Sequence, residues 1–150
     1  MKKIALSLIA VLSLLGASAA ELEWLTNLPQ AKSQAKAENK LVLMDFTGSD
    51  WCPPCKKLKK DVFLSEEFAT FAKANLVLVE VDFPKTKKEI EKQSAELKKA
   101  NEALASKFDI ESFPTVVVLS SNGKQLSKES GYGGTSAKDF VAKLEKFVKK

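Results

Sequence analysis

The sequence predicts an α/β fold in which a central mixed β-sheet is flanked by helices. Short apolar runs alternate with helical patterns in the order of a βαβαβ unit, which places parallel strands in a covered sheet. An Asn122-Gly123 turn follows a further apolar run, and this pair is typical of a β-hairpin and so of an antiparallel edge. With 150 residues, the chain is long enough for one domain with one hydrophobic core.

The first half of the chain carries the pattern of a central strand between helices. Residues 21–25 favour a short strand, and residues 28–39 favour a helix with a narrow apolar face. Residues 41–46 are apolar on both faces, as expected for a central strand that helices cover on both sides. The next helix should begin at the cysteine pair and break near Phe63-Leu64, where Ser65 caps a second helical piece.

The second half adds a long helix, a hairpin and a last helix. We expect a buried strand at residues 76–83 and a charged helix at residues 86–107, opened by a Thr-Lys-Lys-Glu capping-box pattern. After a strand at residues 115–120, the hairpin turn leads into residues 124–129. The last helix begins at Ser136, and its wide apolar face consists of Phe140, Val141, Leu144, Phe147 and Val148.

The first twenty residues predict export. Residues 1–20 have the order of a secretory signal peptide, with a charged start, an apolar run at residues 4–15 and small residues up to Ala20. The apolar run is too short to cross a bilayer as a helix. Cleavage after Ala19 and cleavage after Ala20 both fit the small-residue rule. We expect a mature domain of residues 21–150, periplasmic or secreted and without stable membrane insertion, in a compartment that permits disulfides.

The charged and histidine composition argues against two classes of function. The formal net charge is +5, which falls to +3 without Lys2 and Lys3, and all the positive charge is lysine. Proteins that read base edges and phosphates rely on arginine, so the composition predicts no nucleic-acid role. The chain also lacks histidine, the usual general base, which argues against hydrolase chemistry.

The only cysteines of the chain, Cys52 and Cys55, stand three residues apart just after the central strand. On a helix this spacing is close to one turn, so both sulfurs lie on the same side of its N-terminus. Unpaired backbone N–H groups and the positive end of the helix dipole favour the thiolate there, and the thiolate is the form that attacks disulfides. The spacing therefore favours a dithiol redox centre.

Three structural explanations fit this cysteine pair less well. A disulfide across so short a loop removes little entropy from the unfolded chain and therefore stabilises the fold only weakly. A structural zinc ion needs four ligands, and the chain offers two cysteines and no histidine. Covalent haem needs a histidine after the second cysteine, where Lys56 stands. We therefore expect a redox pair that requires no metal and no cofactor.

An acidic residue interrupts the apolar central strand. Asp45 shares a strand face with Leu41 and Leu43, so burial should raise its pKa and make it a candidate proton acceptor near the two thiols. Asp50 is the alternative acceptor. The helix after the cysteines carries a cluster that we interpret as a solvated face, formed by Lys56, Lys57, Lys59 and Lys60.

Taken together, these segments resemble the thioredoxin superfamily. The resemblance is carried by residues 42–55, Phe113-Pro114-Thr115 and Asn122-Gly123-Lys124, and it covers the chain from about Asn39 onward. It is closest to exported thioredoxin-like proteins with an FTGSDWC segment and a GY-G element near the end. The resemblance implies a thioredoxin-like fold for residues 21–150, with an extra helix before the cis-proline strand.

The resemblance also implies roles for single residues. Cys52 would be the attacking cysteine and Cys55 the resolving one, together forming a redox-active disulfide. Asp45 matches the buried acid that helps to deprotonate the second cysteine. Around them, Trp51 would flank the active-site surface, and Pro114 would be a cis proline beside the disulfide. The backbone of Phe113 would pair with an extended substrate segment, although a core aromatic is a comparable interpretation.

Three departures from thioredoxin bear on these roles. The turn between Asp45 and Cys52 is longer by about one residue, and the strand that often supplies a lysine beside the acid has Leu78 there. The segment before Pro114 is longer by roughly four turns of helix. This extra segment either forms a surface for a partner or covers the hydrophobic core, and we expect it to cover the core.

The sequence thus predicts an exported thiol–disulfide oxidoreductase that exchanges disulfides with protein substrates. Neither histidine nor arginine lies beside the cysteines to stabilise a thiolate strongly, so we expect a reductant or isomerase and not a strong oxidant. We expect a monomer whose partners are protein thiols and disulfides and a membrane-bound or soluble redox partner. Two alternatives remain open: a redox-silent binding or chaperone-like module on the same scaffold, and a copper carrier.

Overall fold

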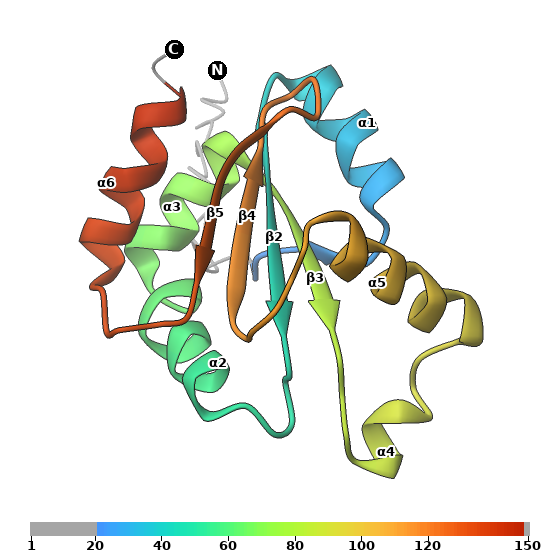
Figure 1. Ribbon diagram of the computed structural model, residues 1–150. Helices are drawn as coiled ribbons and strands as arrows, with labels where there is room; N and C mark the ends of the chain where they lie inside the picture. Colours follow the sequence, from blue (N-terminus) through green and yellow to red (C-terminus); the bar gives the residue numbers. More distant parts are fainter. Residues whose placement is uncertain (1–20, 149–150) are drawn as a thin grey trace, which may run out of the picture.

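The computed structural model describes residues 21–148, in which a five-stranded sheet lies between two layers of helices (Figure 1). The strands run in the order β1-β3-β2-β4-β5. They are β1 (Trp24–Leu25), β2 (Leu41–Thr47), β3 (Leu76–Asp82), β4 (Thr115–Leu119) and β5 (Gln125–Ser130). Strands β1, β3 and β2 are parallel, whereas β4 and β5 are antiparallel to their neighbours, so the predicted mixed sheet is confirmed. The predicted signal peptide lies outside the described residues.

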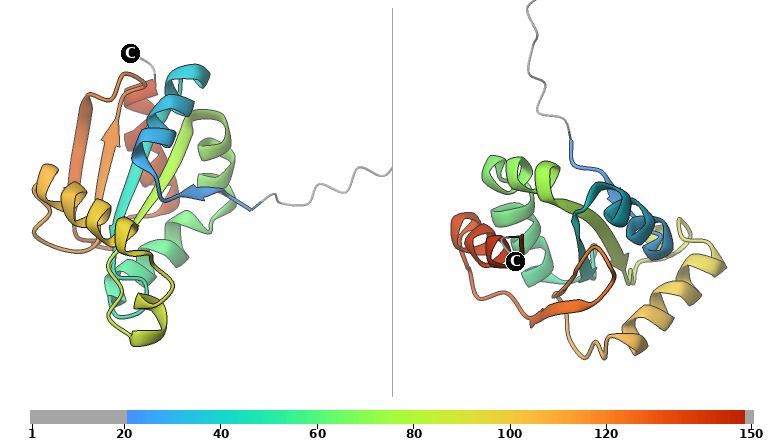
Figure 2. Two further views of the ribbon diagram at one scale, coloured as in Figure 1. Left: turned by 90° about the vertical axis from the view of Figure 1, so that its right-hand side faces the viewer. Right: turned by 90° about the horizontal axis from the view of Figure 1, so that it is seen from above.

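The helices cover both faces of this sheet (Figure 2). One face carries α2 (Pro53–Leu58) with the π-helical turn η1 (Lys59–Phe63) that continues it, α3 (Glu66–Asn75) and α6 (Ala137–Val148). The other carries α1 (Leu28–Glu38) and α5 (Ala95–Lys107), which follows the short helix α4 (Lys87–Ile90). No helix within residues 21–148 is both long and apolar enough to cross a bilayer.

Strand β2 separates two apolar clusters because its side chains alternate between the faces. Leu41 and Leu43 pack with residues of α2, η1, α3 and α6, whereas Val42, Met44 and Phe46 pack with α1 and with Phe108 after α5. All seven residues of β2 are buried, which confirms the expected central strand. The carboxyl end of this strand leads directly to the cysteines.

The predicted helix boundaries around Ser65 are confirmed. The helix that starts at the cysteines ends at Phe63, with Leu64 as its C-cap, and the Ser65 hydroxyl accepts a 3.1 Å hydrogen bond from the Phe68 N–H to open α3. The last helix also starts as expected, since Ser136 Oγ accepts a hydrogen bond from the Asp139 N–H at 3.1 Å. One member of its predicted apolar face does not pack, because Val148 is exposed.

The prediction of a single helix at residues 86–107 is wrong. The chain forms α4 and then restarts at α5, where Ser94 Oγ accepts a 3.1 Å hydrogen bond from the Leu97 N–H. The Thr86 hydroxyl makes no capping bond, so the expected capping box is also wrong. Between the two helices, the Gln93 side chain donates to the backbone carbonyl of Asp82 at 3.0 Å, which turns the chain toward β3.

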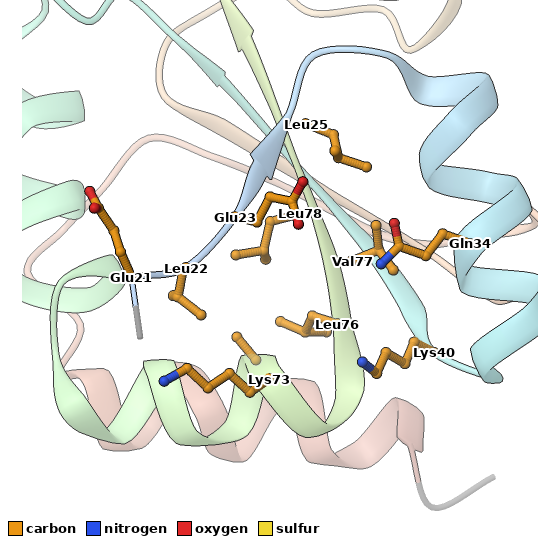
Figure 3. Close-up of a pocket in the computed structure, with 11 residues that line it drawn as sticks. Glu21, Leu22, Glu23, Leu25, Gln34, Lys40, Lys73, Leu76, Val77 and Leu78 are labelled. Atoms are coloured by element: carbon orange, nitrogen blue, oxygen red, sulfur yellow. The ribbon is translucent and has the colours of Figure 1, made fainter. Parts of the chain in front are cut away.

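A cavity of about 290 Å³ lies at the amino ends of β2 and β3 (Figure 3). The cysteines follow the carboxyl end of β2, at the opposite end of this strand. Leu76, Val77 and Leu78 form its wall along β3, and Lys40 and Lys73 stand at its rim. Strand β1 pairs only with Leu78 and Val79, so the cavity lies where the edge of β3 is not covered by β1. It takes no part in the site described below.

Candidate active site

A disulfide joins Cys52 and Cys55 at the N-terminus of α2. Cys52 is the N-cap residue, and Pro53 and Pro54 occupy the first helical positions, where a missing N–H costs no intrahelical bond. The Cys55 N–H donates to Cys52 Sγ at 3.3 Å, so the sulfur takes the place of a capping oxygen. A negative charge on this sulfur would be stabilised by the same donor and by the helix dipole.

The two cysteines are equally buried. Each is 3% exposed in the disulfide-bonded protein, so accessibility does not distinguish the two. The hydrogen bond from Cys55 to Cys52 is what distinguishes the two sulfurs. Among residues 21–148, no group of three or more histidine, cysteine or acidic side chains is placed to hold a metal ion.

Gly48 allows the turn before the cysteines to fold under Trp51. Its carbonyl accepts hydrogen bonds from the Trp51 N–H at 3.2 Å and the Cys52 N–H at 2.9 Å. The indole ring lies so close that a Cβ at this glycine would be 2.5–2.8 Å from ring atoms. Only glycine therefore fits beneath Trp51 in this arrangement.

The same turn is fastened to the end of β3. Asp82 accepts hydrogen bonds from the Ser49 N–H at 2.8 Å and from Ser49 Oγ at 2.6 Å. Asp50 accepts from the Lys85 N–H at 3.1 Å and the Thr86 N–H at 2.6 Å. Asp50, the alternative proton acceptor, is thus occupied in holding the backbone after β3.

An aromatic cluster lies beside the disulfide turn. Trp51 Nε1–H donates to the Phe83 carbonyl at 2.7 Å, and the Trp51 ring meets the edge of Phe113 with centroids 5.9 Å apart. Phe83 contacts Phe113 at a centroid distance of 5.2 Å. The Lys85 ammonium lies 3.6 Å above the Trp51 ring, a cation–π contact. The structure therefore brings Trp51 and Phe113, two of the predicted substrate-binding residues, into contact and adds Phe83 and Lys85 to them.

The Phe113–Pro114 peptide bond is cis, as the resemblance implies. The Pro114 carbonyl accepts a 2.7 Å hydrogen bond from the Gly131 N–H, which joins the proline loop to the glycine-rich segment before α6. Tyr132 in that segment donates to the Thr135 carbonyl at 2.8 Å and to Asp61 at 3.4 Å. The proline loop thus contacts Trp51 through Phe113 and this segment through Gly131.

Asp45 is buried, as predicted, with 5% of its surface exposed. Its Oδ1 has no hydrogen-bond partner among residues 21–148. Burial, and next the negative charge of Glu80, raise its pKa to about 8. A carboxyl group with such a pKa exchanges its proton near neutral pH and suits proton transfer with a thiol.

The residue beside Asp45 on β3 is Glu80 and not Leu78, which pairs with Leu43 instead. The lysine comes from a different element: Lys59 Nζ in η1 lies 3.8 Å from Glu80 Oε2. Sequence reasoning missed this pair because the register of two distant strands is not visible in either strand. The alternation of apolar Val79 and Val81 around Glu80 was the available signal, since it places Glu80 on the same face as Asp45 once the register is known.

Comparisons with known proteins agree with this geometry. Residues 28–148 match the family described as thioredoxin-like domain. The disulfide bond reductase DsbH of Chlamydia pneumoniae is 33% identical over 132 residues, which cover 88% of this chain and 76% of DsbH. The thioredoxin-related protein DsbJ of the same organism is 29% identical over 117 residues, 78% of this chain but 32% of DsbJ.

The same family appears among solved structures. The structure of a DsbH oxidoreductase matches with a TM-score of 0.77 at 32% identity, over 87% of this chain and 86% of that chain. The chain therefore belongs to the thioredoxin-like domain family, and its CXXC disulfide makes it a thiol–disulfide oxidoreductase of that family.

Proposed function

We propose that this oxidoreductase is exported and acts as a reductant or isomerase of disulfides in other proteins. The observation that carries the proposal is the Cys52–Cys55 disulfide at the N-terminus of α2, with Cys52 Sγ accepting the Cys55 N–H. This donor and the helix dipole favour the Cys52 thiolate in the reduced protein. Cys52 is thus the nucleophile, and Cys55 is the resolving cysteine.

The reaction proceeds by two exchanges. The Cys52 thiolate attacks one sulfur of a substrate disulfide, which forms a mixed disulfide and releases the other substrate sulfur as a thiolate. Cys55 then gives its proton to Asp45, and its thiolate attacks Cys52 Sγ. This second exchange forms the Cys52–Cys55 disulfide and releases the remaining substrate sulfur, so two electrons have passed to the substrate and both its sulfurs are protonated from water.

The surface around the disulfide supports binding of an extended substrate segment. We assign Trp51 and Phe113 to substrate binding, because the aromatic cluster flanks the turn that carries Cys52. We assign Pro114, which is buried, from its cis bond and the resemblance to the thioredoxin superfamily. The backbone of Phe113 at the cis bond supplies the pairing groups. Phe83 extends the apolar side of the same surface, since its ring contacts that of Phe113.

Three observations favour a reductant or isomerase over a strong oxidant. A strong oxidant requires an exceptionally stabilised thiolate, and this chain has no histidine or arginine to supply the charge. Pro53 and Pro54 have no N–H to offer the Cys52 sulfur. The related DsbH of Chlamydia pneumoniae is named a disulfide bond reductase. A reductant in an oxidising compartment needs an electron supply, which we assign to a membrane-bound or soluble redox partner.

Export rests on the signal-peptide pattern of residues 1–20. We propose that residues 21–150 form the mature domain, which works as a monomer in the periplasm or after secretion. Mass spectrometry of the protein recovered from a producing bacterium tests this proposal. A mature mass that begins at Ala20 or Glu21 supports export, whereas an intact Met1 start in the cytosol contradicts it.

Two measurements test the catalytic proposal. A Cys55→Ser variant should accumulate a mixed disulfide with a disulfide-bonded peptide, whereas the matched Cys52→Ser variant should not. Equilibration of the wild-type protein with glutathione then measures the reduction potential. A value near that of thioredoxin, about −270 mV, supports a reductant, and a value near that of a strong oxidant, about −120 mV, contradicts it. If the wild-type Cys52–Cys55 pair does not cycle between dithiol and disulfide, the redox-silent binding or chaperone-like module is the remaining interpretation.

A further inference from the structure

Asp45 and Glu80 form a pair of neighbouring carboxyl groups on the face of the sheet that α2 and η1 cover. They are register partners on the parallel strands β2 and β3, so their side chains point to the same side and their backbones lie about 4.8 Å apart. Asp45 is 5% exposed, whereas the Glu80 side chain is 32% exposed. The Glu80 carboxyl group therefore contacts water, whereas the Asp45 carboxyl group scarcely does.

Lys59 completes this arrangement from the helix that carries the cysteines. It stands four residues after Cys55, on the same side of the helix, and its N–H donates to the Cys55 carbonyl. Its Nζ lies 3.8 Å from Glu80 Oε2. The Lys59–Glu80 pair thus joins the helix of the resolving cysteine to the strand beside Asp45.

The charges that face Asp45 come from β3 and from η1. Burial raises the pKa of Asp45 most, the negative charges of Glu80 and Asp82 raise it further, and the positive charge of Lys59 lowers it. Asp82 is held by two hydrogen bonds from Ser49, and the β4 neighbour of Asp45 is the uncharged Val116. Glu80 and Lys59 are therefore the two groups of this set that form an ion pair with each other.

We propose that the Lys59–Glu80 pair regulates Asp45 and thereby sets the pH at which the protein resolves its mixed disulfides. This role rests on the proposed function, in which Asp45 accepts the Cys55 proton. Resolution needs an ionised Asp45 carboxylate, which Lys59 favours and Glu80 opposes. The proton passes from Cys55 Sγ to Asp45 and later to water, and neither Lys59 nor Glu80 changes its bonds. Both are positioning residues, not catalytic ones.

The first test requires no substrate. In the oxidised protein the cysteines do not titrate, so NMR of aspartate labelled with ¹³C at Cγ reports the ionisation of Asp45, with Asp45→Asn identifying its signal. Glu80→Gln should shift the Asp45 midpoint to lower pH and Lys59→Met should shift it to higher pH, each by about half a pH unit or more. The matched controls are Glu102→Gln on α5 and Lys60→Met, which should leave the midpoint in place. Equal midpoints in all variants would overturn the proposal.

The second test measures resolution itself. A mixed disulfide is formed between Cys52 and a thionitrobenzoate label, and its release by Cys55 is followed by absorbance across pH 5 to 10. The midpoint of the release rate should move with the Asp45 midpoint, down in Glu80→Gln and up in Lys59→Met. A loss of folding stability cannot produce these opposite shifts.

The two proposals fail in different ways. A wild-type protein that does not release the label contradicts the proposed function. Release with normal rates but with midpoints that do not follow those of Asp45 contradicts only the regulatory role of Lys59 and Glu80.

Discussion

The Asp50 carboxylate accepts a 2.6 Å hydrogen bond from the Thr86 N–H, which joins the disulfide turn to the start of α4 across 36 residues of sequence. The neighbouring Lys85 N–H points at the same carboxylate. Lys85 in turn covers the Trp51 ring, so one acidic side chain positions the segment that flanks the disulfide. This role explains why an aspartate stands in the longer turn.

Replacing Asp50 should release this segment. Asp50→Ala removes the acceptor of two backbone N–H groups that become free to bind water, so we expect the free energy of unfolding to fall by about 1–2 kcal/mol. Urea denaturation measures the change. Asp50→Asn keeps one acceptor oxygen and should recover part of the loss, whereas an Asp50→Ala variant as stable as wild type would contradict the anchoring role.

Gly48 should not tolerate even one methyl group. The Cβ of Gly48→Ala would overlap the Trp51 ring, so the indole must move and lose its hydrogen bond to Phe83. We expect a loss of about 1–3 kcal/mol in the free energy of unfolding and a shift of the Trp51 indole N–H signal in NMR spectra. Gly133→Ala is the matched control, because its added Cβ meets no atom within 4 Å. Equal effects of the two substitutions would exclude the close contact.

The stability of the protein should fall as pH rises, through Asp45. Its pKa is about 8 in the folded protein against an ordinary 3.8, so the folded state retains a proton that the unfolded chain releases. The resulting destabilisation grows between about pH 4 and pH 8 and is then constant. At about 1.4 kcal/mol per pH unit its upper limit is about 6 kcal/mol, and we expect roughly half of this because water reaches the opened site.

Asp45→Asn should therefore raise the free energy of unfolding by about 3 kcal/mol at pH 8 and change this free energy little at pH 4. Chemical denaturation at several pH values measures this difference. Asp109→Asn is the control, since the Asp109 side chain is 83% exposed. A gain from Asp45→Asn that is the same at both pH values would contradict the raised pKa.

Alkylation of the reduced protein should modify Cys52 before Cys55. The bond from the Cys55 N–H favours the Cys52 thiolate, so at mildly acidic pH iodoacetamide should label Cys52 at least several times faster. Peptide mass spectrometry after short exposure gives the order of labelling. As a control, the remaining Cys55 thiol of the Cys52→Ser variant should react slowly. Faster labelling of Cys55 than of Cys52 in the wild-type protein would reverse the roles of the two cysteines.

The strands and the position of the disulfide were predictable because they depend on local patterns. Residues 41–46 alternate between two apolar clusters, and the position of the cysteine pair just after this strand, with its spacing of three, places both sulfurs at a helix N-terminus. Asp45 was predictable as a buried acid for the same reason, since two leucines share its face. In each case the physical cause lies within a few residues.

The features that escaped prediction depend on contacts between distant segments. Glu80 became the neighbour of Asp45 through strand register, which no local pattern reveals. The helix expected at residues 86–107 divides because Ser94 starts a new helix and Gln93 bonds to Asp82, eleven residues earlier.

Helix α5 is attached to the domain by one buried amide and by apolar side chains that are only partly buried, Leu104 and Ala105. Asn101 is its one buried residue, and the Asn101 Nδ2–H donates to the Asp82 carbonyl at 3.0 Å. A layer attached in this way opens at a lower free energy than the sheet it covers, so its amide protons should exchange with solvent before those of α3. The Asp82 carboxylate also holds Ser49, so local unfolding of α5 loosens the residue that anchors the disulfide turn. The segment that lengthens this chain is thereby linked to the mobility of its active site.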